Sequence, residues 1–453
     1  MSRSRLARVC LFAALLQLGL AVSSCSRGWG SPLAAGSNDR VLRGSPELPG
    51  SSTVTTIAVW THEHVNSPQF EALRRTAAKF NAGQGRYRVE LLSSLNRKYE
   101  AWLLGAALTG ELPCVFEFDG PYVHELAWSG DLQPLERFVS AWMLQDFLPS
   151  VLAEGRHGGH LYSLGQYESG LALWGNRRYL RQAGVRVPTL RNPWSLEEFE
   201  AALRKLGALP GIDYAIDMGA YSTSGEFYTY AYSPILQGFG GDLLDRAPGG
   251  GARQTLDGAA SVLALRRLQH WFQQGWARAD RNRAQAFVSG AAALAWSGNW
   301  YYAEYLQRLG RDLVLLPLPD LGRGIKTGVG SWVWGISSTC QEPRGAWAFL
   351  SFLLSPEEMQ HMTDASSMMP ARRSVLERSR LYGPGGPLRL FVEQLDAKLA
   401  VPRPATAAYE TITTSFATAT VGILEGGDVQ AQLSEAARRI DAEISRRRGY
   451  PHQ

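Results

Sequence analysis

Two carboxylates, Glu117 and Asp119, stand two positions apart at the end of the β-type run Cys114–Phe118. Side chains at alternate positions of a strand share one face, so both carboxyl groups point to the same side. Such a pair has two chemical uses. It could supply the acid and the nucleophile of a glycoside hydrolase, or its oxygens could accept hydrogen bonds from sugar hydroxyls. Hydrolysis needs one raised pKa and a defined separation, and neither is visible in a sequence.

The segment His62-Glu63-His64 contains metal-ligand residue types. It lacks the helical HExxH spacing and a third ligand nearby. His157 and His160 flank two glycines, which indicates an exposed turn. We therefore expect no metal and no cofactor. For His62 and Glu63 two interpretations stay open, a surface loop and direct contact with a small ligand.

The elements that position these residues follow from the first apolar runs. Strands and helices are predicted to alternate at Thr55–Trp60, Ser67–Phe80, Tyr87–Leu92, Tyr99–Leu108 and Cys114–Phe118. This alternation is typical of parallel βαβ units, whose ligands gather beyond the carboxyl ends of the strands. The loops after the first and third strands open at that edge. They supply the candidate contacts Trp60, His62, Glu63, Asp119 and Tyr122.

A second α/β region follows. Leu161–Trp174 is strand-like, Ser195–Glu198 is a capping box that opens a helix to Leu206, and Asp257 is predicted to cap a helix to Gln274. Further strands and helices are expected at Val314–Leu318, Trp332–Ile336, Ala346–Leu354 and, as an apolar stripe, from Leu433 to Ile444. The sequence therefore predicts a two-lobed α/β protein.

Composition excludes several classes. The 453 residues are 45% apolar and 19% charged, which is globular and unlike a coiled-coil, collagen-like or disordered chain. The net charge is +5, but Arg3, Arg5 and Arg8 lie in residues 1–24, which carry no carboxylate. A basic footprint for nucleic acid is therefore not expected.

Residues 1–25 resemble a lipoprotein signal peptide. The three arginines precede the apolar stretch Val9–Val22, and Val22-Ser23-Ser24-Cys25 resembles a bacterial lipobox, in which Cys25 becomes acylated. The alternative is ordinary cleavage after Ser23. Residues 26–52 are rich in Ser, Gly and Pro and are predicted to be a flexible tether. We expect an exported protein, lipid-anchored to the cell membrane and facing the periplasm or the exterior. Pairing of the two later cysteines is possible there.

Fragments in a fixed order carry a family resemblance. They are IAVW (57–60), GELPCV (110–115), GDLQPL (130–135), GHLYSL (159–164), LWGNRRYLRQAGV (173–185), AFVSGAAALAWSGNW (286–300), AWAFLSFLLSPE (346–357) and MMPAR (368–372). Together they resemble family 1 of the extracellular solute-binding proteins of ABC sugar importers, distant relatives of maltose-binding protein. Cys114 stands where the family usually has Asp, and Trp174-Gly175 where it usually has Tyr.

The resemblance implies a type II periplasmic-binding-protein-like fold with hinge strands between two lobes. The N-lobe would be residues 53–160 with about 330–375, and the C-lobe 161–329 with about 376–453. The implied function is that of a monomeric receptor, not an enzyme, that captures a carbohydrate and delivers it to ABC permease subunits driven by a separate ATPase. Alternatives on the same fold are a polyol or glycerophosphodiester receptor and a sensor partner. A cell-surface glycoside hydrolase is disfavoured.

The resemblance also assigns roles. Asp119 would accept sugar hydroxyls, and Trp300, in the Gly-x-Trp position, would stack on a sugar ring. The presumed hinge crossings add Tyr167, Glu168, Ser331 and Trp332, the aromatic segment 221–230 adds Tyr221, Glu226 and Tyr228, and the Met-Pro-Ala turn adds Arg372, which follows it. The fold that the resemblance implies also brings Cys114 and Cys340 within disulfide range, at the side of the N-lobe away from the cleft.

Overall fold

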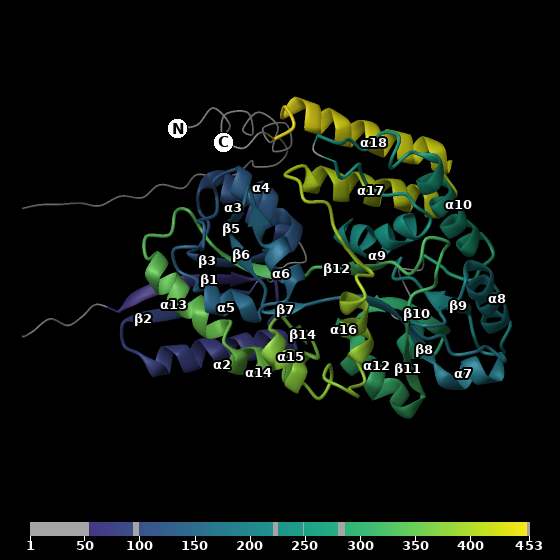
Figure 1. Ribbon diagram of the computed structural model, residues 1–453, viewed down its shortest axis with the longest axis horizontal. Coiled ribbons are helices and arrows are strands. Elements are labelled where there is room, and N and C mark those ends of the chain that lie inside the picture. Colours follow the sequence, from purple (N-terminus) through teal and green to yellow (C-terminus); the bar gives the residue numbers. More distant parts are fainter. Residues whose placement is uncertain (1–53, 94–98, 221–224, 248, 280–285, 451–453) are drawn as a thin grey trace, which may run out of the picture.

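The computed structural model describes residues 54–93, 99–220, 225–247, 249–279 and 286–450. The expected signal peptide 1–25 with Cys25, the tether 26–52 and Tyr221 lie outside the described residues. The protein has two lobes that lie side by side, each built around its own sheet (Figure 1). Within the described ranges, no helix combines the length and apolar character that crossing a bilayer requires.

The first lobe contains a five-stranded sheet of order β2-β1-β3-β13-β6. Its strands are β1 (Thr55–Thr61), β2 (Tyr87–Ser93), β3 (Val115–Asp119), β6 (Ser163–Leu164) and β13 (Trp332–Ile336). β1 runs parallel to β2 and β3, whereas β13 runs antiparallel to β3 and β6. The carboxyl ends of β1 and β3 therefore share one edge with the start of β13.

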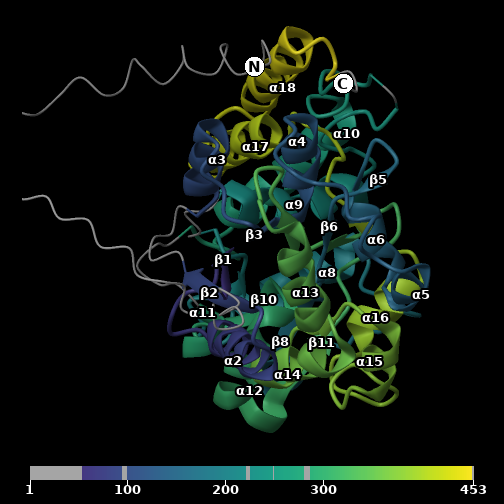
Figure 2. The same cartoon turned by 90° about the vertical axis from the view of Figure 1, so that its left-hand side faces the viewer.

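Helices α2 (Pro68–Gly83), α3 (Tyr99–Thr109), α13 (Pro343–Leu353) and α14 (Pro356–Ser366) accompany this sheet, as Figure 2 shows from the side of the first lobe. The side chain of Ser67 accepts a hydrogen bond from the backbone N–H of Phe70, so it caps α2 as its position before Pro68 predicts. The buried face of α2 includes Leu73, Ala77 and Phe80.

The second lobe contains a four-stranded sheet of order β11-β8-β10-β9. Its strands are β8 (Leu171–Asn176), β9 (Tyr214–Asp217), β10 (Ala292–Gly298) and β11 (Leu313–Leu316), and its larger helices are α8 (Leu196–Gly207), α9 (Gly225–Gly238), α10 (Ala259–Gln273), α17 (Tyr409–Leu424) and α18 (Val429–Arg446). α8 opens on the predicted capping box of Ser195 and Glu198. The helix cap expected at Asp257 is wrong by one position: Gly258 is the N-cap of α10, and Asp257 accepts a hydrogen bond from the backbone of Gln254 instead.

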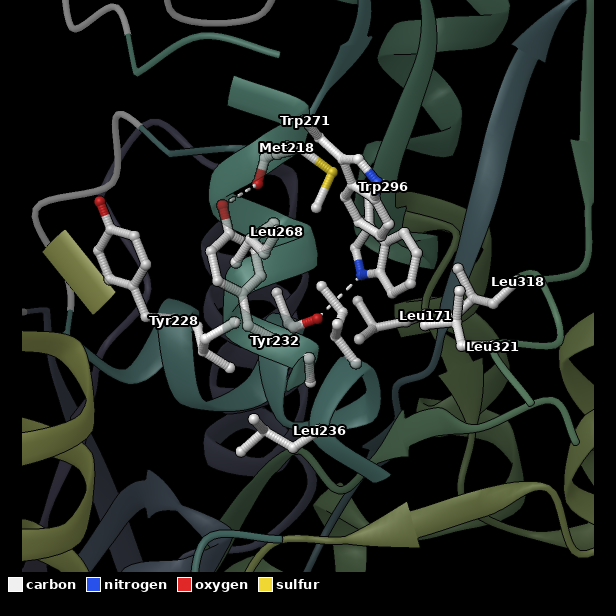
Figure 3. Close-up of a cluster of buried hydrophobic side chains, with 14 of the residues drawn as sticks. Leu171, Met218, Tyr228, Tyr232, Leu236, Leu268, Trp271, Trp296, Leu318 and Leu321 are labelled. Atoms are coloured by element: carbon white, nitrogen blue, oxygen red, sulfur yellow. Dashed lines mark hydrogen bonds between the residues drawn. The ribbon is translucent and has the colours of Figure 1, made fainter. Parts of the chain in front are cut away.

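The core of the second lobe packs large aromatic side chains from α9, α10 and β10 (Figure 3). The buried hydroxyl of Tyr232 donates to the carbonyl of Met218 at 3.0 Å, and the indole N–H of Trp296 donates to the carbonyl of Ala231 at 2.9 Å. Each polar atom is thus satisfied inside an apolar cluster, as burial requires.

The segment Leu161–Trp174 is strand-like, as predicted, but interrupted, because the chain crosses between the lobes there. It is divided into β5 (His160–Leu161), β6, β7 (Tyr167–Glu168) and β8. The crossing brings Gly170 close to its neighbours, since a Cβ added there would lie 3.1 Å from the ring of Phe391. A second crossing is formed by β12 (Thr327–Val329), which pairs in parallel with β15 (Ala400–Pro402).

The remaining elements are short. They are β4 (Arg156–His157), β14 (Met369–Pro370), α4 (Val123–Trp128), α5 (Ala141–Asp146), α6 (Pro149–Glu154), α7 (Arg177–Gln182), α11 (Ala286–Ser289), α12 (Tyr302–Leu309), α15 (Arg373–Arg378), α16 (Arg389–Asp396) and the 3-10 turns η1 (Gly120–Tyr122), η3 (Asn299–Tyr301) and η4 (Gly310–Asp312). α16 lies against the second sheet, where the ring of Phe391 is 6.1 Å from that of Trp174.

A disulfide joins Cys114 and Cys340, which are 226 positions apart in sequence. Cys114 precedes β3, and Cys340 follows β13, the antiparallel neighbour of β3. The bond therefore lies within the first lobe, at the end of the sheet opposite to Asp119.

Candidate functional site

A cavity of about 340 Å³ lies between the two lobes, at the carboxyl ends of β1 and β3. Both lobes contribute to its walls. The lining residues are His62, Glu63, Gln69, Glu100, Asp119, Tyr167, Ser169, Glu226, Phe227, Tyr230, Trp300, Gly330, Ser331, Trp332, Met368 and Arg403.

The first-lobe wall is a stacked pair, His62 and Trp332. Their ring centroids are 3.5 Å apart and the ring planes differ by 3°. His62 follows β1 and Trp332 opens β13, and both strands flank β3. Nδ1 of His62 lies 2.8 Å from Oε2 of the buried Glu117, which fixes the plane of the imidazole.

His62 carries a positive charge at neutral pH. Burial by itself would lower its pKa, but the carboxylates of Glu117 and Glu63 outweigh burial and raise the pKa of His62 to about 9. An imidazolium over an indole face is also favoured by the cation–π interaction. The stacked pair is thus a flat, preorganised surface with a fixed charge.

The second-lobe wall is aromatic as well. The rings of Trp300 and Tyr230 lie 5.8 Å apart at an angle of 54°. The glycine of the Gly-x-Trp motif, Gly298, is needed for this position of the Trp300 ring, because a Cβ on residue 298 would lie 1.9 Å from that ring. The glycine lets the indole lie directly on the backbone at the end of β10.

Arg403 connects the lobes at the floor of the cavity. Its Nη1 and Nη2 donate to both oxygens of Asp119 in the first lobe, at 2.7 and 2.8 Å. Nη1 also donates to Glu226 of α9 at 2.6 Å, and Nη2 lies 3.4 Å from Glu154. The guanidinium sits 5.1 Å from the ring of Tyr230.

One guanidinium therefore faces three carboxylates. Burial raises the pKa of Glu154 and of Glu226 above the ordinary range of a carboxyl group, and the charge of Arg403 opposes this only in part. Burial also raises the pKa of Glu63 and Glu100, which line the same cavity. The site is rich in hydrogen-bond acceptors, and its two cations are held by carboxylates.

The structure gathers eight of the residues that the sequence singled out as ligand contacts: His62, Glu63, Asp119, Tyr167, Glu226, Trp300, Ser331 and Trp332. Five others do not line the cavity. Trp60 stacks on Trp102 at 3.8 Å, and Tyr228 is buried in the core, donating to the carbonyl of Ala220.

The other three are engaged elsewhere. Tyr122 is buried and donates to Glu410, and Glu168 accepts hydrogen bonds from the side chain of Ser150 and from backbone N–H groups at both crossings. Arg372 is buried beside Asp146, at 3.5 Å, and over the ring of Phe147. These contacts support the frame around the cavity.

Sequence reasoning missed Arg403, Tyr230, Phe227, Glu100, Gln69 and Met368. Tyr230 and Phe227 lie in the aromatic segment that we singled out, but without the helix α9 its inward face could not be chosen. Arg403 stands in Val-Pro-Arg-Pro, where flanking prolines indicate a stiff extended segment. The pattern therefore predicts that Arg403 is held in an ordered segment, but it does not predict the partner of the guanidinium.

The carboxylate pair of β3 is not arranged for hydrolysis. Glu117 is buried behind the cavity, where Thr61 and Tyr167 donate to it beside His62. Asp119 reaches the cavity but is bound through both oxygens by Arg403. In the part of the chain that the structure describes, no group of three His, Cys, Asp or Glu side chains is placed to hold a metal ion.

Solved structures of other proteins have the same fold. The GacH receptor of Streptomyces glaucescens, solved unliganded and with acarbose, superposes with a TM-score of 0.72 at 23% identity, covering 86% of this chain and 98% of that one. The maltotriose-binding protein of Thermus thermophilus gives 0.71 at 18% identity over 86% and 100%. These likenesses show the fold.

Relatives in sequence are distant. An uncharacterised lipoprotein of Streptomyces antibioticus is 23% identical over 75% of both chains. A maltotriose-binding protein of Pyrococcus abyssi is 22% identical over 64% of this chain and 61% of the relative. These proteins are solute-binding proteins or lipoproteins by description. Residues 75–381, more than half of the chain, match the family described as bacterial extracellular solute-binding protein, and the chain belongs to that family.

Proposed function

We propose that this protein is the receptor of an ABC importer and that it captures a mono- or oligosaccharide in the cavity between its lobes. The observation that carries the proposal is the pair of aromatic walls, His62 on Trp332 from one lobe and Trp300 with Tyr230 from the other. Sugar rings present apolar C–H faces, which pack on flat aromatic surfaces. Their hydroxyl edges need the fixed polar groups that remain around the walls.

The charge of the site favours a sugar over a phosphodiester. Arg403 already binds Asp119 and Glu226, and His62 lies against Glu117. A phosphate would have to displace these carboxylates, whereas sugar hydroxyls donate to them. The acceptor-rich lining therefore argues against a glycerophosphodiester as the main ligand.

Capture would work by closure of the lobes. Because the walls come from different lobes, a ligand makes all its contacts only when the lobes are together, and this differential affinity favours the closed state. The lobes also touch outside the cavity: the rings of Trp128 and Tyr450 are 4.9 Å apart. In this proposal the closed receptor, anchored through Cys25, delivers its sugar to permease subunits whose ATPase is a separate chain.

Thermal shift of the purified protein tests the proposal against saccharides, polyols and glycerophosphodiesters. A ligand present at about 100 times its Kd should stabilise the protein by about 2.7 kcal/mol. We expect at least one saccharide to do so and to be recovered unchanged. Trp300→Ala and Trp332→Ala should each weaken its binding at least tenfold. Trp142→Ala is the matched control, since that indole is 76% exposed and lies outside the cavity lining.

If no saccharide raised the melting temperature and a glycerophosphodiester did, the carbohydrate assignment would be wrong. Consumption of the saccharide would instead indicate an enzyme.

A further inference from the structure

A second and larger cavity, of about 760 Å³, lies against the segments that cross between the lobes. We call it the rear cavity. Gly330 and Arg403 line both cavities, so they form part of the wall that separates the two. Most of the rear cavity comes from α6, α15, α16, the β12–β15 pair and the residues directly after β15, and Pro121, His124 and Arg246 also line it. Apart from Gly330 and Arg403, none of its lining residues lines the sugar site.

The chemistry of the rear cavity differs from that of the sugar site. Its inner surface is aliphatic, from Leu148, Val329, Leu376, Val392 and Leu395 together with several prolines and alanines. Among the described residues that line it there is no Trp, Tyr or Phe. Without an aromatic platform the rear cavity is poorly suited to a sugar ring, and its aliphatic floor suits an apolar body.

Cationic side chains outnumber carboxylates around this floor: Arg246, Arg373, Arg389, Lys398 and Arg403 line the rear cavity together with Glu154, Glu377 and Asp396. Arg246 and Arg389 line the rear cavity and pair with Asp242 at 2.6 Å and with Asp396 at 3.7 Å. Arg373 and Lys398 are exposed at the same cavity, and neither forms an ion pair with any carboxylate that the structure describes. An arginine and a lysine without partners beside an apolar floor complement a molecule that carries a negative group at one end.

We propose that the rear cavity is a second ligand site, for a small organic anion with an apolar body, such as a medium-chain carboxylate or an aromatic sulfonate. The apolar body packs on the aliphatic floor, and the anionic group lies beside Arg373 and Lys398. The volume falls within the range of pockets that bind drug-sized molecules.

The position of the rear cavity links it to the sugar site. Val329, Ala400 and Pro402 of the paired strands β12 and β15 form its wall, and Arg403 follows directly. Glu154 lines the rear cavity and accepts a hydrogen bond from the backbone of Ser331, a residue of the sugar cavity. In this proposal an anion bound here contacts the crossing strands, has different affinities for the two lobe arrangements, and thereby changes the affinity for sugar. This coupling rests on the proposed function, whereas the binding site does not.

Binding is tested with the fluorescent anion 8-anilinonaphthalene-1-sulfonate on the purified full chain, with displacement by decanoate below its micelle concentration and by decanol below its solubility limit. We expect saturable binding that decanoate displaces at least five times more effectively than decanol. Arg373→Glu should weaken binding at least fivefold, and Ala153→Trp, which places an indole in the rear cavity, should abolish it. Arg380→Glu, an exposed charge reversal outside the lining, is the matched control and should bind as the wild type does.

Equal binding by wild type, Arg373→Glu and Ala153→Trp would overturn the site, and so would equal displacement by decanoate and decanol. Melting temperatures of the variants verify that each is folded. No saccharide enters these measurements, so their result is independent of the proposed function. A separate titration with maltotriose, with and without decanoate, then measures the coupling: an unchanged Kd in a protein that binds both ligands would refute it.

Discussion

The charge on His62 makes the stability of this protein depend on pH in a defined direction. Its pKa rises from 6.5 to about 9 on folding, so the folded state binds a proton that the unfolded state has lost at pH 8. A raised pKa stabilises the folded state fully below pH 6.5, and this contribution disappears as the pH rises through 9. We predict that His62→Gln removes the part of this dependence that His62 contributes, because glutamine can still donate to Glu117 but cannot be protonated. The contributions of Glu154 and Glu226, whose pKa values burial also raises, remain in the variant.

The magnitude follows from the shift. At 1.36 kcal/mol per pKa unit the full contribution is about 3 kcal/mol, of which roughly 2.5 kcal/mol is lost between pH 6.5 and pH 9. Divided by the unfolding entropy expected for a chain of this length, this loss of free energy lowers the melting temperature by about 3 °C. The raised pKa values of Glu63 and Glu100 act in the same direction, since their protonated forms are favoured in the folded state. The wild type should therefore lose at least this much.

The assay is a series of melting curves from pH 6 to pH 9.5 at constant ionic strength. We expect the difference between wild type and His62→Gln to shrink by about 3 kcal/mol across this range. His64→Gln, an exposed histidine two positions along the same loop, is the matched control and should follow the wild type. Parallel curves for wild type and His62→Gln would refute the reasoning, because His62 would then carry no extra proton when folded.

Two further predictions concern covalent and steric constraints. Replacing Cys114 and Cys340 by serine removes a link across 226 positions, for which the chain-entropy estimate is about 5 kcal/mol. Melting should fall by several degrees, reduction of the wild type should reproduce the fall, and unchanged melting would contradict it. Gly330→Ala should destabilise the protein and weaken saccharide binding, because a Cβ there, at φ +106°, would lie 2.2 Å from Glu154. Gly324→Ala is the control, because Gly324 also has a positive φ, +76°, but open space around it, so this variant should lose only the free energy of the strained backbone. If both variants lost the same stability, the clash with Glu154 would not be the cause.

The sequence predicted those elements whose signals are local. Ser67 before Pro68 and the capping box at Ser195 begin α2 and α8 because a cap needs only a side chain three positions from its acceptor. The apolar runs at Thr55–Trp60 and Trp332–Ile336 likewise predicted the strands β1 and β13. The sequence predicts the strand-like character of 161–174 but not the breaks between its short strands, because those breaks depend on which lobe each residue joins.

The candidate site was predictable where a motif carried it and not where distant residues meet. Trp300 was found because the glycine two positions earlier is part of the same local geometry. Arg403 was missed because its carboxylate partners lie 284, 249 and 177 positions away, and no short-range pattern reports such a meeting. Arg372 was predicted to contact the ligand because it follows a recognisable turn. In the structure its guanidinium instead pairs with Asp146, away from the cavity.

The bond between Cys114 and Cys340 makes the polypeptide a closed ring with two tails. Every strand of the second sheet, from β8 to β11, belongs to the ring, yet the bond that closes the ring lies next to β3 and β13 of the first sheet. The disulfide thus stabilises the first lobe without linking it to the second, and rotation of one lobe relative to the other does not strain the bond. It also means that a protease that cuts once between Cys114 and Cys340 opens the ring without dividing the molecule. A receptor exposed outside the cell would keep both lobes, and the cavity between them, until a reductant or a second cut arrived.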